Sequence, residues 1–200
     1  MTAIDISSWF GLGALTVLTL NILIGLLLST KYNPVRHWPH RRVDTVTLHN
    51  WTGYVALALS LTHPVVILAS STAHFHVVDL VWPVNAPRQP VVNTLGALAL
   101  YLLIVIVATS YFRFEIGRRV WKPLHFVTYA LFALYAAHAL LTDPTLKDAP
   151  VDWIDGEKIY VELCILLVAI ATAFRVRWQL GRPPRRQHRP KQRASPARST

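Results

Sequence analysis

Four histidines lie inside two stretches of this sequence that are apolar enough to cross a lipid bilayer. They are His49 and His63 in residues 48–68, and His125 and His138 in residues 119–141. An imidazole in hydrocarbon is costly unless its polar atoms are satisfied, so side chains of this kind inside a membrane usually serve a function. Haem iron is the ligand that best fits paired imidazoles inside a membrane.

The spacing of the histidines places them at two depths. His49 and His63 are 14 residues apart, and His125 and His138 are 13 apart. At ~1.5 Å per residue, these separations are about 21 and 20 Å along a helix. If both helices run in the same direction, each depth receives one histidine from each helix. Bis-histidine ligation of two stacked b-type haems requires this arrangement. The sequence therefore predicts an inner pair, His49 with His125, and an outer pair, His63 with His138.

The angular spacing agrees with this pairing on only one of the two helices. At ~100° per residue, 14 residues return to within about 40° of the starting face, but 13 residues leave His138 about 140° away from His125. Either the helix that carries this second pair is locally irregular, or the outer haem is rotated about the bilayer normal. Pro64, directly after His63, could also kink the first of the two helices.

The composition indicates an all-α, polytopic membrane protein. Of its 200 residues, 53% are hydrophobic and only 15% are charged, whereas ordinary globular domains carry about 25% charged residues. A bilayer leaves no partner for free backbone groups, so apolar stretches of about 20 residues are expected to be helices. Five stretches qualify as transmembrane helices: residues 9–28, 45–70, 91–112, 120–141 and 158–174.

The basic residues give an orientation in the membrane. The net charge is +10, yet 17 of the 20 lysines and arginines fall in residues 31–44, residues 113–122 and the tail from Arg175. Five alternating helices put all three segments on one side, which the positive-inside rule assigns to the cytoplasm. The N-terminus is then outside and the C-terminus is cytoplasmic. Since the charge is explained by topology, we expect no binding of nucleic acid.

Residues 1–178 are predicted to form the haem-binding domain, and residues 179–200 a basic, disordered cytoplasmic tail. The tail is rich in proline and arginine, has no apolar periodicity, and could touch anionic lipid headgroups. Two further histidines, His74 and His76, form an HxH in an outer loop and would make a weak metal site. Four cations near the inner end could pair with haem propionates, although their topological role suffices to explain them: Arg113, Arg118, Arg119 and Lys122.

The histidine pattern and one continuous stretch resemble the ferric reductase-like transmembrane domain family. The stretch is ATSYFRFEIGRRVWKPLHFVTYALFALYAAH, residues 108–138, preceded by Leu95 and Gly96. This family includes ferric reductases, NADPH oxidases and the haem subunit of bacterial methionine sulfoxide reductase systems. The resemblance covers about residues 10–178. It implies that His49 and His125 ligate an inner haem b, and that His63 and His138 ligate an outer haem b.

The resemblance implies electron transfer across the cell membrane, by a protein that acts as the haem subunit of a reductase system rather than as a free-standing enzyme. These 200 residues contain no GxGxxG, and we expect the protein to have no flavin- or nicotinamide-binding domain of its own. Electrons would therefore come from a flavoprotein, a membrane quinol or a loosely bound flavin. They would leave to an oxidoreductase or another acceptor outside the cytoplasm. Five helices are one fewer than the six often drawn for this family.

Another class of function also fits intramembrane histidines. A membrane transport or scaffold protein could use them for a metal ion instead of haem. Such transporters usually add nearby Asp or Glu and broken helices. Here the central part of each predicted span contains no acidic residue. We therefore favour electron transfer over this alternative.

Overall fold

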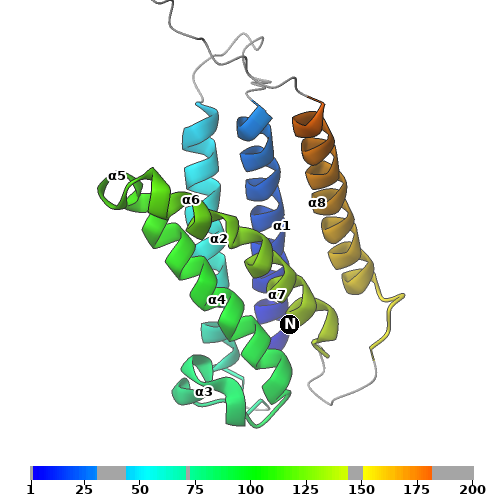
Figure 1. The fold of residues 1–200 in the computed structure, drawn as a ribbon. Helices are drawn as coiled ribbons and strands as arrows, with labels where there is room; N and C mark the ends of the chain where they lie inside the picture. The colour runs from blue at the N-terminus through cyan, green and yellow to red at the C-terminus, as the bar shows by residue number, and fades with distance from the viewer. Residues whose placement is uncertain (1, 31–43, 71–72, 144–150, 182–200) are drawn as a thin grey trace, which may run out of the picture.

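The described part of the chain is entirely helical. The computed structural model describes residues 2–30, 44–70, 73–143 and 151–181, and these contain no strand (Figure 1). The elements in chain order are α1 (Ala3–Thr30), α2 (Thr45–Ile67), α3 (Val77–Val81), the 3₁₀ helix η2 (Pro83–Asn85), α4 (Pro90–Tyr111), α5 (Arg113–Ile116), α6 (Arg118–Phe126), α7 (Thr128–Leu141) and α8 (Gly156–Leu180). The predicted all-α class is confirmed.

Four stretches of helix in the described residues are long and apolar enough to span a membrane. They are α1, α4, the combined segment Arg118–Leu141, and α8. The fold is therefore that of a multi-pass membrane protein, as predicted. Helix α2 has 23 residues, which is enough to span, but it carries several polar side chains, and these lower its mean hydropathy. The count of five transmembrane helices stays a prediction.

Successive long helices run in opposite directions. In Figure 1 the N-terminus of α1, the end of α2, α3 and the start of α8 lie at the lower end of the bundle. The start of α2, α5 and the end of α8 lie at the upper end. Helices α2 and α6–α7 consequently run in the same direction, which the pairing of histidines requires. That the upper end faces the cytoplasm is a prediction from charge.

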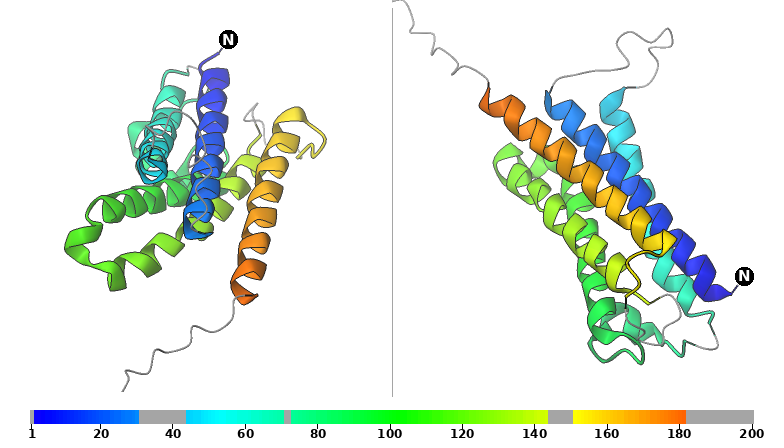
Figure 2. Two further views of the ribbon diagram at one scale, coloured as in Figure 1. Left: turned by 90° about the horizontal axis from the view of Figure 1, so that it is seen from above. Right: turned by 90° about the vertical axis from the view of Figure 1, so that its right-hand side faces the viewer.

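Two helix pairs make up most of the packing. Helix α1 packs along α2, and α4 packs along α7, while α8 contacts α1 and α7. Seen from above, α4 and α6–α7 cross the α1–α2 pair at a slant (Figure 2). Buried alanines at the contacts let the backbones approach closely: Ala14, Ala56, Ala99 and Ala136. Larger buried side chains, including Leu15 and Leu131, fill the middle of the bundle.

The segment with the second pair of histidines is not one straight helix. Helix α6 ends at Phe126 and α7 begins at Thr128. At the junction the N–H of Val127 donates to the carbonyl of Leu124, 3.1 Å away, which is the i to i−3 bond of a tighter turn. Pro123 lies inside α6 and has no N–H to continue the regular ladder. Of the two explanations for the angular mismatch, local irregularity of this helix is the one observed.

The division into a domain, residues 1–178, and a tail, residues 179–200, stays a prediction. Helix α8 continues to Leu180, so its last two residues belong to the segment predicted as tail. The remainder of the tail, residues 182–200, lies outside the described residues.

Candidate functional site

The four histidines form two facing pairs, one near each end of the bundle. The ring centroids of His49 and His125 are 6.0 Å apart, and those of His63 and His138 are 6.1 Å apart. In both pairs the ring planes are inclined at 78°. The pairing predicted from sequence is therefore the pairing observed, one histidine from α2 and one from α6 or α7 at each level.

The separation within each pair matches two imidazoles on opposite sides of one metal ion. A metal–imidazole bond is about 2 Å long, and the bonding nitrogen lies about 1 Å from its ring centroid, so the centroids would be roughly 6 Å apart. Both pairs have this spacing. The gap between the two rings of a pair fits a ligand plane that carries a metal at its centre.

The inner histidine of α2 is held by helix α1. His49 Nδ1 lies 3.1 Å from the backbone oxygen of Asn21 and donates to it, since a carbonyl can only accept. In return, the side-chain Nδ2 of Asn21 donates to the backbone oxygen of His49, 2.5 Å away, and to Thr52 Oγ1, 2.8 Å away. This reciprocal contact fixes both the ring and the register of α1 against α2.

The outer histidines are held in the same way. His63 Nδ1 donates to the backbone oxygen of Ser7 at 2.7 Å, and the Ser7 hydroxyl donates back to the backbone oxygen of His63 at 2.8 Å. His138 Nδ1 donates to the backbone oxygen of Val92 at 2.8 Å. In these three rings the proton is on Nδ1, so the lone pair is on Nε2. An Nδ1–H bond to a backbone carbonyl is the usual support of a metal-binding histidine.

His125 is positioned by a different set of contacts. Its Nδ1 lies 3.4 Å from the hydroxyl oxygen of Ser110. The indole of Trp121 stacks on the imidazole, with centroids 5.0 Å apart and planes inclined at 26°, and its Nε1 donates to the same hydroxyl at 3.3 Å. Ser110 on α4 thus connects the two aromatic rings.

Glycines make the room for three of the four imidazoles. A Cβ added at Gly96 would lie 2.9 Å from both Cε1 and Nδ1 of His138. Added at Gly11 it would lie 3.1 Å from His63 Nδ1, and at Gly25 it would lie 3.2 Å from His49 Cε1. These distances are shorter than ordinary contacts. Each glycine therefore allows an imidazole to lie directly against a neighbouring helix.

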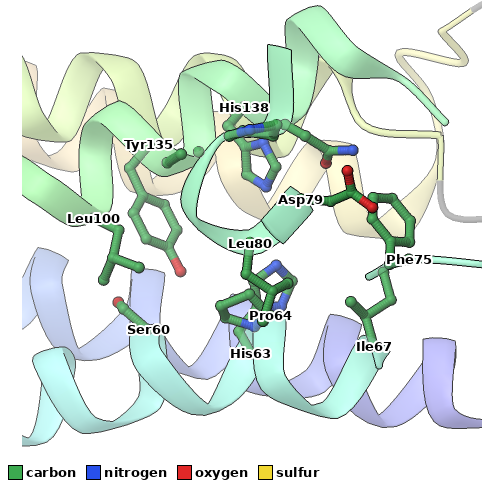
Figure 3. Close-up of a pocket in the computed structure, with 14 residues that line it drawn as sticks. Ser60, His63, Pro64, Ile67, Phe75, Asp79, Leu80, Leu100, Tyr135 and His138 are labelled. Carbon is green, nitrogen blue, oxygen red and sulfur yellow. The ribbon is translucent and has the colours of Figure 1, made fainter. Parts of the chain in front are cut away.

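Cavities flank both pairs. Two cavities share His49 and His125 in their walls, one bounded by α4 and the other, of about 340 Å³, bounded by α8. Two more share His63 and His138. Figure 3 shows the outer pair, with the imidazoles extending toward each other across the pocket and with Tyr135 beside them. Apolar residues of the α3–η2 region, such as Leu80 and Pro83, close its outer end. Each pair of imidazoles therefore has free space next to it on more than one side.

The two histidines of the HxH motif do not join these pairs. His76 precedes α3, and its Nδ1 lies 3.4 Å from Asp79 Oδ2. Within the described ranges no three or more His, Cys, Asp or Glu side chains are grouped to hold a metal ion. The residues that position the imidazoles were not predicted, because backbone carbonyls such as those of Ser7, Asn21 and Val92 leave no signal in a sequence.

Comparison with known proteins gives one match. The family model described as "Ferric reductase like transmembrane component" matches residues 10–136, which include three of the four paired histidines and end two residues before His138. Neither the curated proteins nor the solved structures contain a match. Because the matched segment is well over half of the chain and carries the helices of both pairs, the protein belongs to the ferric reductase-like transmembrane component family.

Proposed function

We propose that the protein is the haem subunit of a reductase system and passes electrons across the membrane through two b-type haems. The inner haem would be held by His49 and His125, and the outer haem by His63 and His138. The observation that carries this proposal is the geometry of the two pairs, with centroids 6.0 and 6.1 Å apart and three of four Nδ1 atoms bonded to backbone oxygens. Membership of the family supports electron transfer across a membrane in general.

The protein's own residues contribute position and surroundings to this function. The bonds at Nδ1 hold each ring in one tautomer, so that Nε2 is available as a ligand. Buried leucines between the two levels, among them Leu15 and Leu131, exclude water from the middle of the bundle. When bound, haem supplies one-electron redox chemistry whose potential depends on axial ligands, burial and hydrogen bonding.

The direction of transfer follows from the predicted orientation. The His49–His125 pair lies toward the end of the bundle that is predicted to face the cytoplasm. The His63–His138 pair lies toward the opposite end, near α3. A flavoprotein, a membrane quinol or a loosely bound flavin would donate at the first pair. A periplasmic or extracellular oxidoreductase, or another acceptor, would be reduced at the second pair.

The alternative of a metal transporter or scaffold receives no comparable support. Two isolated imidazole pairs offer two ligands each, and transported ions usually meet acidic side chains as well. In the part of the chain that the structure describes, no third histidine, cysteine or carboxylate completes either pair.

Vesicles test the proposed transfer of electrons across the membrane. Purified protein is reconstituted into liposomes that contain ferricyanide, and dithionite is added outside. We expect the enclosed ferricyanide to be reduced at least tenfold faster in vesicles with the wild-type protein than in vesicles with the His63→Ala variant. That variant lacks one of the two proposed ligands of the outer haem. The His76→Ala variant, which changes an exposed histidine outside both pairs, should match the wild type. Equal rates for wild type and His63→Ala would refute transmembrane electron transfer.

A further inference from the structure

Helix α8 carries no histidine and lies beyond the segment matched by the family model. It nevertheless places a cationic side chain in the wall of a cavity at each level. Arg175 lines the cavity beside His49 and His125. Lys158 lines a cavity beside His63 and His138. Their separation of 17 residues corresponds to about 25 Å along the helix, slightly more than the ~20 Å expected between the two levels.

The guanidinium of Arg175 lies over the ring of Trp178, 5.3 Å from its centroid, but one of its nitrogens has no hydrogen-bond partner among the described residues. Its Nε donates to Ser29 Oγ, and Nη2 lies 3.4 Å from the Ser29 backbone oxygen. Nη1 is buried and has no hydrogen-bond partner among the described residues. The hydroxyl oxygen of Thr172, one turn earlier in α8, is also buried. It is the other buried side-chain nitrogen or oxygen without a hydrogen-bond partner among the described residues. Both residues line the same cavity.

A buried N–H or hydroxyl group without a hydrogen-bond partner is costly. Nη1 of Arg175 and Oγ1 of Thr172 are both donors, and together they suit one negatively charged acceptor. A carboxylate is the group that arginine binds best in such a setting, through short charge-assisted hydrogen bonds. The cavity of about 340 Å³ between these donors and the inner imidazoles leaves room for such a group.

Lys158 presents a related arrangement at the outer level. The residue is only 5% exposed, and its Nζ donates to the backbone oxygens of Ala139 at 2.8 Å and Thr142 at 2.6 Å. These bonds use two of the three ammonium protons. Among the described residues no carboxylate lies within 4.0 Å of Nζ, although those of Glu157, Asp155 and Asp143 are close enough to act on its charge. Glu157 also lines the adjoining cavity, so what Lys158 offers to a group bound there is the one ammonium proton that no backbone oxygen accepts.

We propose that α8 binds the carboxylates of the two tetrapyrroles, with Arg175 and Thr172 at the inner level and Lys158 at the outer level. This inference rests on the proposed function, since it assumes a macrocycle at each pair. In this proposal the carboxylates of both macrocycles are bound by α8, a helix that supplies none of the four histidines. The four cations considered from sequence do not line the cavities beside the two pairs, although Arg113 is close enough to His49 to act on it electrostatically. Arg113 lies over the ring of Phe114, Lys122 lies near Phe126, and Arg118 and Arg119 are exposed.

Redox titration of the purified full-length protein tests this role. Loss of a cation beside a haem disfavours the reduced form, so Arg175→Gln should keep both haems but lower the midpoint potential of one component. We expect about a tenfold change in the equilibrium constant for reduction, which is about 59 mV for one electron. Arg175→Lys keeps the positive charge, so its midpoint potential should be close to that of the wild type. The matched control is Arg177→Gln, an exposed arginine on the same helix, which should leave both potentials unchanged.

The outer level provides a second arm. Lys158→Gln should lower the potential of the other component, while Lys158→Arg keeps the charge and the potential. If the Gln variant does not fold, the Arg175 arm decides the proposal. Intact haem content with potentials no different from the Arg177→Gln control would overturn the proposal but leave the proposed function standing. A wild-type protein without haem would overturn both.

Discussion

Replacement of His125 by alanine is expected to remove one of two haems and to leave the other bound. The reason is that each pair supplies both axial ligands of its own iron, so a remaining single imidazole holds the cofactor weakly. His49→Ala should have the same effect. Haem quantitation per chain and the reduced-minus-oxidised spectrum of the purified variants measure the result, which should be about half of the wild-type b-type absorbance.

Double variants test the pairing itself. His49→Ala combined with His125→Ala should lose no more haem than either single change, because both residues serve one level. His49→Ala combined with His63→Ala should lose nearly all of it. His76→Ala is the matched control for an exposed histidine. The pairing would be wrong if the His49–His125 double variant lost both haems while His49–His63 kept one.

The second large effect is expected from a single methyl group at Gly96. A Cβ there would lie 2.9 Å from Cε1 and Nδ1 of His138, and the ring cannot retreat without losing its bond to the Val92 backbone oxygen. Gly96→Ala should therefore displace the imidazole and reduce outer haem occupancy to below half, although alanine itself favours the helix by about 1 kcal/mol. Haem content and a single-component redox titration measure this.

Gly13 on α1 offers a matched control. A Cβ at Gly13 would meet only Leu59 Cδ1, at the ordinary contact distance of 3.8 Å. Gly13→Ala should leave both haems in place and should slightly raise thermal stability. If Gly96→Ala kept full outer haem occupancy, the ring of His138 would not be held where its contacts with Val92 and Gly96 place it.

Much of this arrangement could be predicted because histidines in hydrocarbon are conspicuous. Residue counting alone placed His49 level with His125 and His63 level with His138, and the observed pairs agree. The apolar stretches located the long helices to within a few residues, except that α1 begins at Ala3, ahead of the predicted Trp9, and α8 continues to Leu180, beyond the predicted Phe174. The residues before Trp9 are polar enough to hide the helix, yet they include Ser7, which contacts His63.

The rest depends on geometry that residue types do not encode. The break between α6 and α7 corrects an angular mismatch of about 140°, and only the backbone at Val127 reveals it. The propionate partners suggested from sequence were Arg113, Arg118, Arg119 and Lys122, near the end that is predicted to be cytoplasmic. Arg175 looked like one more cation of the tail, because its unpartnered Nη1 becomes visible only when α8 is packed beside the inner pair.

The most direct test of the central claim is the haem content of the purified wild-type protein. A pyridine haemochrome assay with protein quantitation gives haem per chain, and electron paramagnetic resonance of the oxidised protein reports the axial ligands. Two b-type haems per chain, both with the low-spin signals of two nitrogen ligands, are the predicted result. A colourless protein, or one with a single haem that survives loss of either pair of histidines, would contradict it.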